Sequence, residues 1–170
     1  TMRGGWNVTT SIRRQFFRFD PAFYAPDSVI VTGGTGPDTI PFAVPGKLDN
    51  LLNASGRITT PVFRRFSGNV SAGYAAGVIF QEAVESRETR TAAQLDWRPM
   101  RQARVSVQYT RLVIDRARDG SRFSTEDIPR FRLEYQASRA IFFRFVGQYT
   151  ARRRSALLDG QGRPLFTLGA

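Results

Sequence analysis

Arginine and large apolar residues alternate almost one for one in the stretch DIPRFRLEYQASRAIFFRFVGQYTARRR, residues 127–154. Alternation with period two places the two kinds of side chain on opposite faces of a β-strand, whereas a helical face needs a spacing of three or four. The segment ARVSVQYTR, residues 103–111, and four earlier segments show the same period. The chain is therefore predicted to be all-β, with about seven strands of about 10 to 15 residues, well above the usual strand length in a soluble sheet.

The predicted connections differ in length at the two ends of these strands. Three are short, and we expect the pairing around TPVFR, RPMRQ and ASR to centre on Val62, Arg101 and Ser138. The others are longer and polar: a loop at about 20–47, then QEAVESRE, then RARDGSRFSTED. An antiparallel up-and-down meander with this asymmetry is typical of an outer-membrane β-barrel, which has short periplasmic turns and long outer loops. Near Gln15 the alternation slips, which predicts a β-bulge.

Strands of this kind fit two environments. In a soluble sheet the apolar face packs against a second layer and the arginines meet water, whereas in a membrane barrel the apolar face contacts lipid and the arginines line the interior. Ten residues at about 3.3 Å each, tilted by about 45°, rise roughly 23 Å, close to the apolar band of about 25 Å in such barrels. Trp97 and Tyr135 near the short turns, with Tyr149 toward the other end, match aromatic girdles and favour the barrel.

Each face then has a predicted environment. The residues predicted to face lipid are Val105, Val107, Tyr109, Phe131, Leu133, Tyr135, Ile141, Phe143 and Phe145. The residues predicted to form a basic interior face are Arg90, Arg98, Arg104, Arg130, Arg132 and Arg144. An open interior of this kind favours anionic solutes, whereas in a plugged interior the arginines pair with carboxylates or donate to loop carbonyls.

The charge balance and the missing residue types limit the possible functions. The chain has 25 Lys and Arg residues against 14 Asp and Glu, a net charge of +11 that favours an anionic partner such as nucleic acid, lipid phosphate or an acidic solute. It has no histidine and no cysteine, which excludes Ser-His and Cys-His nucleophile pairs and thiolate or imidazole zinc sites. No apolar run reaches the roughly 18 residues of a transmembrane helix. We expect no enzyme activity, no cofactor, and no catalytic or metal-binding residue.

Three weaker patterns have ordinary explanations. TGGTGPDT, residues 32–39, lacks the Gly-Lys-Ser/Thr ending of a phosphate-binding loop and is predicted to belong to the long outer loop. The acidic residues near the predicted outer ends match no metal-binding loop and are interpreted as solvated charge: Glu82, Glu85, Glu88, Asp115, Asp119, Glu126 and Asp127. The arginines at those ends are candidates for binding lipid phosphate, namely Arg116, Arg118, Arg122 and Arg152 to Arg154. Nucleic acid is not expected as a partner, because the alternation separates the strand arginines from the aromatic residues that would stack on bases.

Four segments carry a resemblance that covers nearly the whole chain. IPFAVPGKLDNL, TPVFRRFSGNVSAG, LDWRPMRQARVSVQYT and DGSRFSTEDIPRFRLEYQASRAIFFRFVGQY resemble the C-terminal region of a bacterial family of uncharacterised domains. In that family the region follows an N-terminal carbohydrate-binding family-9-like domain and is thought to form an outer-membrane barrel. The resemblance implies location in the bacterial outer membrane, with lipid and the rest of a longer chain as partners. The family has no established catalytic residues to carry over.

The chain departs from that family at both ends. It lacks the carbohydrate-binding-like domain and a closing strand with a terminal aromatic residue, so we expect residues 1–170 to be one partial barrel domain truncated at both ends. The expected function is that of a non-catalytic barrel segment, an anchor or conduit for a glycan-related module. The alternative is a soluble antiparallel β protein that binds an anionic ligand or nucleic acid.

Overall fold

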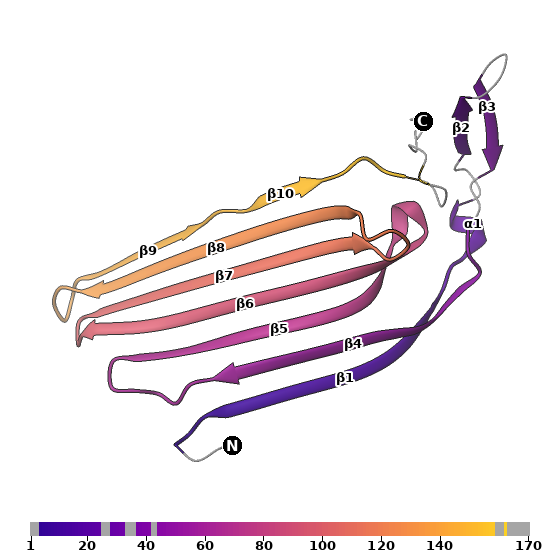
Figure 1. Ribbon diagram of the computed structural model, residues 1–170. Helices are drawn as coiled ribbons and strands as arrows, with labels where there is room; N and C mark the ends of the chain where they lie inside the picture. The colour runs from indigo at the N-terminus through magenta and orange to yellow at the C-terminus, as the bar shows by residue number, and fades with distance from the viewer. Residues whose placement is uncertain (1–3, 25–27, 33–36, 42–43, 159–161, 163–170) are drawn as a thin grey trace.

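The computed structural model describes residues 4–24, 28–32, 37–41, 44–158 and 162, and it shows an open antiparallel sheet. Eight strands follow the order β1-β4-β5-β6-β7-β8-β10, with β9 also beside β8, so that strands adjacent in the sheet follow one another along the chain (Figure 1). The sheet does not close, because β1 lies at one edge while β9 and β10 lie at the other. The predicted all-β, up-and-down meander is confirmed.

The strands are long and each predicted alternating segment lies in one of them. Their bounds are β1 Asn7–Arg18, β4 Lys47–Thr59, β5 Phe66–Ile79, β6 Val84–Met100, β7 Ala103–Arg116, β8 Arg122–Gln136, β9 Phe142–Gln148 and β10 Ala151–Arg154. The last two continue one another along β8, since β9 pairs with the half of β8 nearer the short turn and β10 with the other half. The longest strand, β6, has 17 residues. The expected bulge is also present, because the register between β1 and β4 shifts between Gln15 and Phe17.

The predicted alternation of short and long connections is wrong at two places. β5 and β6 are joined by the 3-10 turn η1, Phe80–Glu82, and by Ala83, which has a left-handed φ of 48°. β7 and β8 are joined by residues 117–121 alone. The polar segments QEAVESRE and RARDGSRFSTED were expected to be loops, but the ladder continues into both, with Val78 opposite Glu85 and Asp115 opposite Arg122. The polar residues of these two segments therefore lie largely within the strands and do not mark where the strands end.

The connection between β1 and β4 is the long one in the described part of the chain. It contains a four-residue helical turn, α1, Pro21–Tyr24, and a hairpin of β2, Ser28–Thr32, with β3, Pro37–Pro41. The glycine-rich segment TGGTGPDT includes the last residue of β2 and the first three of β3, and its residues 33–36 lie outside the described residues.

The three short turns keep the expected faces but not all the expected centres. Trp97 lies opposite Val105, as expected for that turn. Tyr135 lies opposite Phe143 rather than Ile141, and the turn between β4 and β5 is displaced in the same direction. Each displacement moves the partner by an even number of residues, so every side chain stays on its expected face.

The buried residues gather at the end of the sheet opposite the short turns. Phe19, Tyr24 and Ala83 form a small apolar cluster, and the Tyr24 hydroxyl donates to the carbonyl of Phe80 at 2.9 Å. This cluster ties α1 to the turn between β5 and β6. Along the middle of the strands, the described residues form a single layer with both faces open.

Candidate functional site: the two faces of the sheet

The register brings the predicted lipid-facing residues together on one face. Leu133 of β8 lies between Val105 of β7 and Phe145 of β9, and Val107 lies opposite Phe131. Because side chains alternate along each strand, this face carries eight residues of the predicted set: Val105, Val107, Tyr109, Phe131, Leu133, Tyr135, Phe143 and Phe145. Ile141 lies just before β9 and outside the paired strands, and contact of the set with lipid stays a prediction.

This apolar face is uncovered from one edge of the sheet to the other. Ile12 in β1 is 77% exposed, Val70 in β5 is 61% exposed, and Phe145 in β9 is 60% exposed. Even Val107, in the middle of the sheet, is 45% exposed. A continuous apolar surface of this extent is unfavourable in water and marks a surface with an apolar partner.

The apolar band crosses the strands at a slant. One register row on this face runs through Val8, Ile58, Val70, Ala93, Tyr109, Pro129 and Tyr149. In β1 this row lies at the short-turn margin of the band, but after β9 it lies about eight residues from that margin. Eight residues at about 3.3 Å each, over six strand spacings of about 4.8 Å, correspond to a slant of about 40°. The short turns are staggered in the same direction (Figure 1). A slant of about 40° matches the strand tilt of closed barrels.

Polar and aromatic side chains mark both margins of the band. At the margin away from the short turns, the Tyr109 hydroxyl donates to Asp127, and Arg111 Nε lies 3.8 Å from the same carboxylate. Near the short turns, Trp97 lies opposite Phe66 on the apolar face. The apolar band is therefore bounded by aromatic side chains near the short turns and by charged side chains at the opposite margin.

The opposite, polar face is hollowed. Two hollows of about 470 and 430 Å³ are lined by Ser11, Arg13, Asn53, Ser55, Arg57, Glu88 and Arg90, among others. These residues come from β1, β4, β5 and β6, and Leu112 of β7 also lines the larger hollow. The linings combine small residues, such as Ser55 and Gly73, with long ones, such as Arg13 and Arg90. The polar face is thus hollowed across the strands from β1 to β7.

Three of the six predicted interior arginines, Arg104, Arg132 and Arg144, form ion pairs on the polar face. The Asp96 carboxylate accepts hydrogen bonds from Arg104 Nη2 at 2.9 Å, from Gln94 Nε2 at 2.9 Å and from the Ser106 hydroxyl. On the next strands, Glu134 lies 3.4 Å from Arg144 Nε and 3.9 Å from Arg132 Nη1. Carboxylates thus partly neutralise these arginines.

The other predicted interior arginines lie apart from these pairs. Arg130 lines the same small hollow as Arg104 and Arg132 but forms no ion pair within the described residues. Arg90 lines the two larger hollows. Arg98 lies at the short turns and not among these ion pairs. The polar face therefore has ion pairs, which a plugged interior would have, and also unpaired arginines, which an open interior would have. That this face lines the interior of a barrel stays a prediction.

A buried ion pair at the far end of the sheet has no counterpart in the sequence-based expectations. Arg116 at the end of β7 donates from Nε to Glu82 Oε2 at 2.7 Å and from Nη2 to Oε1 at 2.6 Å. The two side chains are 2% and 0% exposed. Glu82 was interpreted as solvated charge, and this is wrong, because η1 turns its carboxylate toward β7. Nothing in the local sequence around Glu82 indicates that its carboxylate pairs with Arg116, which lies 34 residues further along the chain.

This ion pair also holds the segment that follows β10. Arg116 Nη2 donates to the carbonyl of Ala156 at 2.8 Å, and Glu82 Oε1 accepts the backbone N–H of Leu158 at 2.8 Å. The backbone N–H of Ser155 donates to the carbonyl of Phe123. Residues 155–158 therefore cross from the β10 edge toward the turn between β5 and β6 (Figure 1).

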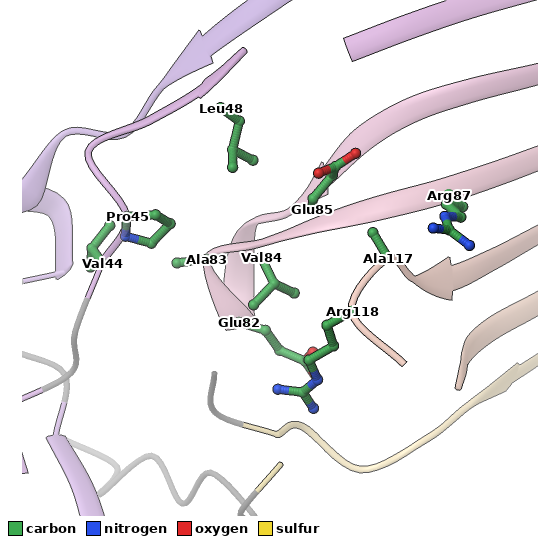
Figure 2. A pocket seen from close by; sticks show the side chains of 10 residues that line it. All are labelled: Val44, Pro45, Leu48, Glu82, Ala83, Val84, Glu85, Arg87, Ala117 and Arg118. Atoms are coloured by element: carbon green, nitrogen blue, oxygen red, sulfur yellow. The ribbon is translucent and has the colours of Figure 1, made fainter. Parts of the chain in front are cut away.

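A hollow of about 650 Å³ lies next to the buried pair. Figure 2 shows Val44, Pro45 and Leu48 on one side of it, with Glu85 and Arg87 on the other. Glu82 also lines the hollow, and its carboxylate binds Arg116 and the backbone N–H of Leu158.

Most arginines proposed above as phosphate ligands at this end already have acidic partners. Arg122 pairs with Asp115, Arg118 with Asp119 and Arg152 with Glu126. In the loop 117–121, hydrogen bonds from the side chain and backbone of Ser121 hold the pKa of the Asp119 carboxyl below its usual value. These pairs make the far end of the sheet nearly self-neutralising and weaken the case for lipid phosphate there.

No group of Asp and Glu side chains that could hold a metal ion occurs among the residues that the structure describes. Within the same residues, no helix has the length and apolar character needed to cross a membrane. Comparison with protein-family models, curated proteins and solved structures gave no match for this chain.

Proposed function

We propose that this chain is a non-catalytic wall segment of a bacterial outer-membrane β-barrel, with its apolar face toward lipid and its polar face toward the interior. The observation that carries the proposal is the contrast between the two faces of the sheet. The polar face is hollowed and bears Asp96, Arg104, Glu134 and their partners, while the opposite face bears uncovered apolar residues such as Val107. A water-soluble barrel has the reverse arrangement, with an apolar interior and a polar exterior.

The geometry of the apolar band supports the same function. Its slant of about 40° fits the tilt of about 35–45° of strands in membrane barrels. The aromatic residues Trp97 and Phe66 near one margin, with Tyr109 and Tyr149 near the other, correspond to the girdles of such barrels. Both features describe the whole sheet and do not depend on a single side chain.

The open edges define what else the barrel requires. In hydrocarbon, each unpaired backbone group costs several kcal/mol, so the edges at β1 and at β9 with β10 need partners. Further strands of a longer chain would supply them, as the family resemblance implies. The carbohydrate-binding-like domain of that family makes an anchor or conduit for a glycan-related module the role we propose.

Cysteine scanning tests which face meets water. Residues 1–170 contain no cysteine, so single cysteines at 104–107 in β7 can be labelled one at a time in the full-length protein, with any cysteine elsewhere replaced by serine, after reconstitution in liposomes. A membrane-impermeant maleimide should label Arg104→Cys and Ser106→Cys, which line the interior, and should spare Val105→Cys and Val107→Cys, which lipid covers. The readout is the labelled fraction by mass spectrometry.

The soluble alternative gives a different pattern. In a soluble β protein that binds an anionic ligand or nucleic acid, the exposed residue Val107 would meet water, and its cysteine would react as fast as the one at Ser106. Equal labelling on both faces would therefore contradict the barrel. Detergent-solubilised and heat-denatured protein should label at all four positions, which controls for the reactivity of each cysteine.

A further inference from the structure

Four arginines surround one hollow at the short-turn end of the sheet. Arg64 and Arg65 come from the turn between β4 and β5, and Arg98 and Arg101 come from the end of β6 and the turn after it. The hollow has a volume of about 500 Å³ and is completed by Pro99 and Met100. The backbone N–H of Arg98 donates to the carbonyl of Arg65 at 2.6 Å, which holds the two turns side by side.

This turn-end arginine cluster lacks acidic partners. None of its members forms an ion pair within the described residues, and the turn sequences TPVFRRF and RPMRQA contain no acidic residue. At the opposite end, Arg111, Arg118, Arg122 and Arg152 all have such partners. Like charges around one hollow repel one another, so an anion bound among them would relieve an unfavourable arrangement.

Apolar side chains next to the cluster indicate what kind of anion fits. Phe63 and Phe66 stack with ring centroids 4.5 Å apart, and Phe66 lies opposite Trp97. Phe66, Trp97 and Met100 are 46%, 48% and 54% exposed. Aromatic residues of this kind lie at the level of the headgroups in a bilayer, directly beside the acyl chains. A ligand here would meet arginines and an apolar surface at once.

We propose that the turn-end arginine cluster binds the phosphate of a phospholipid headgroup in the leaflet that faces the short turns. A planar guanidinium group can donate two parallel hydrogen bonds to two oxygens of one phosphate, and the aromatic side chains contact the acyl chains of the same lipid. This site rests on the proposed function, since it needs a bilayer around the apolar face. It lies at the end of the sheet opposite the arginines that the sequence predicted to bind lipid phosphate.

Competition between two lipids tests the site. The full-length protein is placed in nanodiscs that contain equal amounts of phosphatidylglycerol and a galactosyl diacylglycerol with identical acyl chains. Of these two lipids, only phosphatidylglycerol has a phosphate in its headgroup. After gentle removal of the bulk lipid, native mass spectrometry counts the retained molecules of each. We expect the wild type to favour phosphatidylglycerol by about tenfold or more, and the variant Arg64→Gln/Arg65→Gln/Arg98→Gln/Arg101→Gln to lose this preference.

A matched variant removes the same charge from the other end: Arg111→Gln, Arg118→Gln, Arg122→Gln and Arg152→Gln together. It should keep the preference, and an equal loss in both variants would overturn the site by showing an effect of net charge alone. Displacement of the lipid by millimolar inorganic phosphate would also overturn it, in favour of a soluble anion. Wild-type protein that enters nanodiscs but retains both lipids equally contradicts only the site, whereas protein that does not enter nanodiscs contradicts the proposed function and the site with it.

Discussion

Glu82→Gln is expected to lower the free energy of unfolding by about 3–5 kcal/mol, the largest effect of any single change considered for this chain. The substitution keeps the shape of the side chain but leaves the Arg116 guanidinium, only 2% exposed, without its opposite charge. It also weakens the acceptor for the Leu158 backbone N–H, so the segment after β10 loses part of its attachment. Urea titration of the full-length protein in detergent micelles measures the change.

Two controls separate burial from simple loss of charge. Asp49→Asn removes one partner of the Lys47–Asp49 pair, whose side chains are 43% and 55% exposed, and should cost less than about 1 kcal/mol. Replacing both buried partners, Glu82→Leu with Arg116→Met, should recover much of the loss, because no isolated charge remains. A cost for Glu82→Gln as small as that for Asp49→Asn would show that water reaches the pair.

Val107→Arg is expected to destabilise the protein in a bilayer by about 2–4 kcal/mol, since a charge then lies near the centre of the apolar band. Val107 is in β7, between Leu95 and Phe131 on the neighbouring strands, and no described residue covers it. Unfolding by urea in liposomes measures the cost. In water the same side chain is 45% exposed, and the change should lie within about 0.5 kcal/mol.

Ala103→Arg provides the matched control for this prediction. Ala103 lies on the same face of the same strand, opposite Tyr135 at the short-turn margin of the band. An arginine there reaches the headgroups, so its cost should fall to about 0–1 kcal/mol. Equal costs at Val107 and Ala103 would contradict a lipid-facing band, because depth in the bilayer would then have no effect.

The faces of the sheet were predictable from sequence because period two directly specifies which side chains share a side. Val105, Leu133 and Phe145 lie together as the alternation indicates, and so do Asp96 and Arg104 on the other face. The alternation does not specify register, since sliding one strand by two residues leaves every face unchanged. This explains why Tyr135 pairs with Phe143 and not with Ile141.

The polar end of the sheet was harder to predict. Its acidic and basic residues resemble loop charge in sequence, yet they extend the strands and pair with one another, as Asp115 does with Arg122. The burial of Glu82 against Arg116 depends on a 3-10 turn and on the path of residues 155–158, which no local pattern encodes. The turn-end arginine cluster is likewise assembled from two turns that only the register brings together.

Fluorescence quenching by brominated lipid tests the central claim, that lipid covers the apolar face, most directly. In a Trp6→Phe/Trp97→Phe background, Leu133→Trp and Arg132→Trp place a new tryptophan on neighbouring residues that point to opposite faces. Bilayers of lipids brominated in mid-chain should strongly quench the tryptophan introduced at Leu133 and leave the one at Arg132 nearly unchanged. Equal quenching at the two positions, or none at either, would contradict a lipid-facing apolar surface and favour the soluble binding protein.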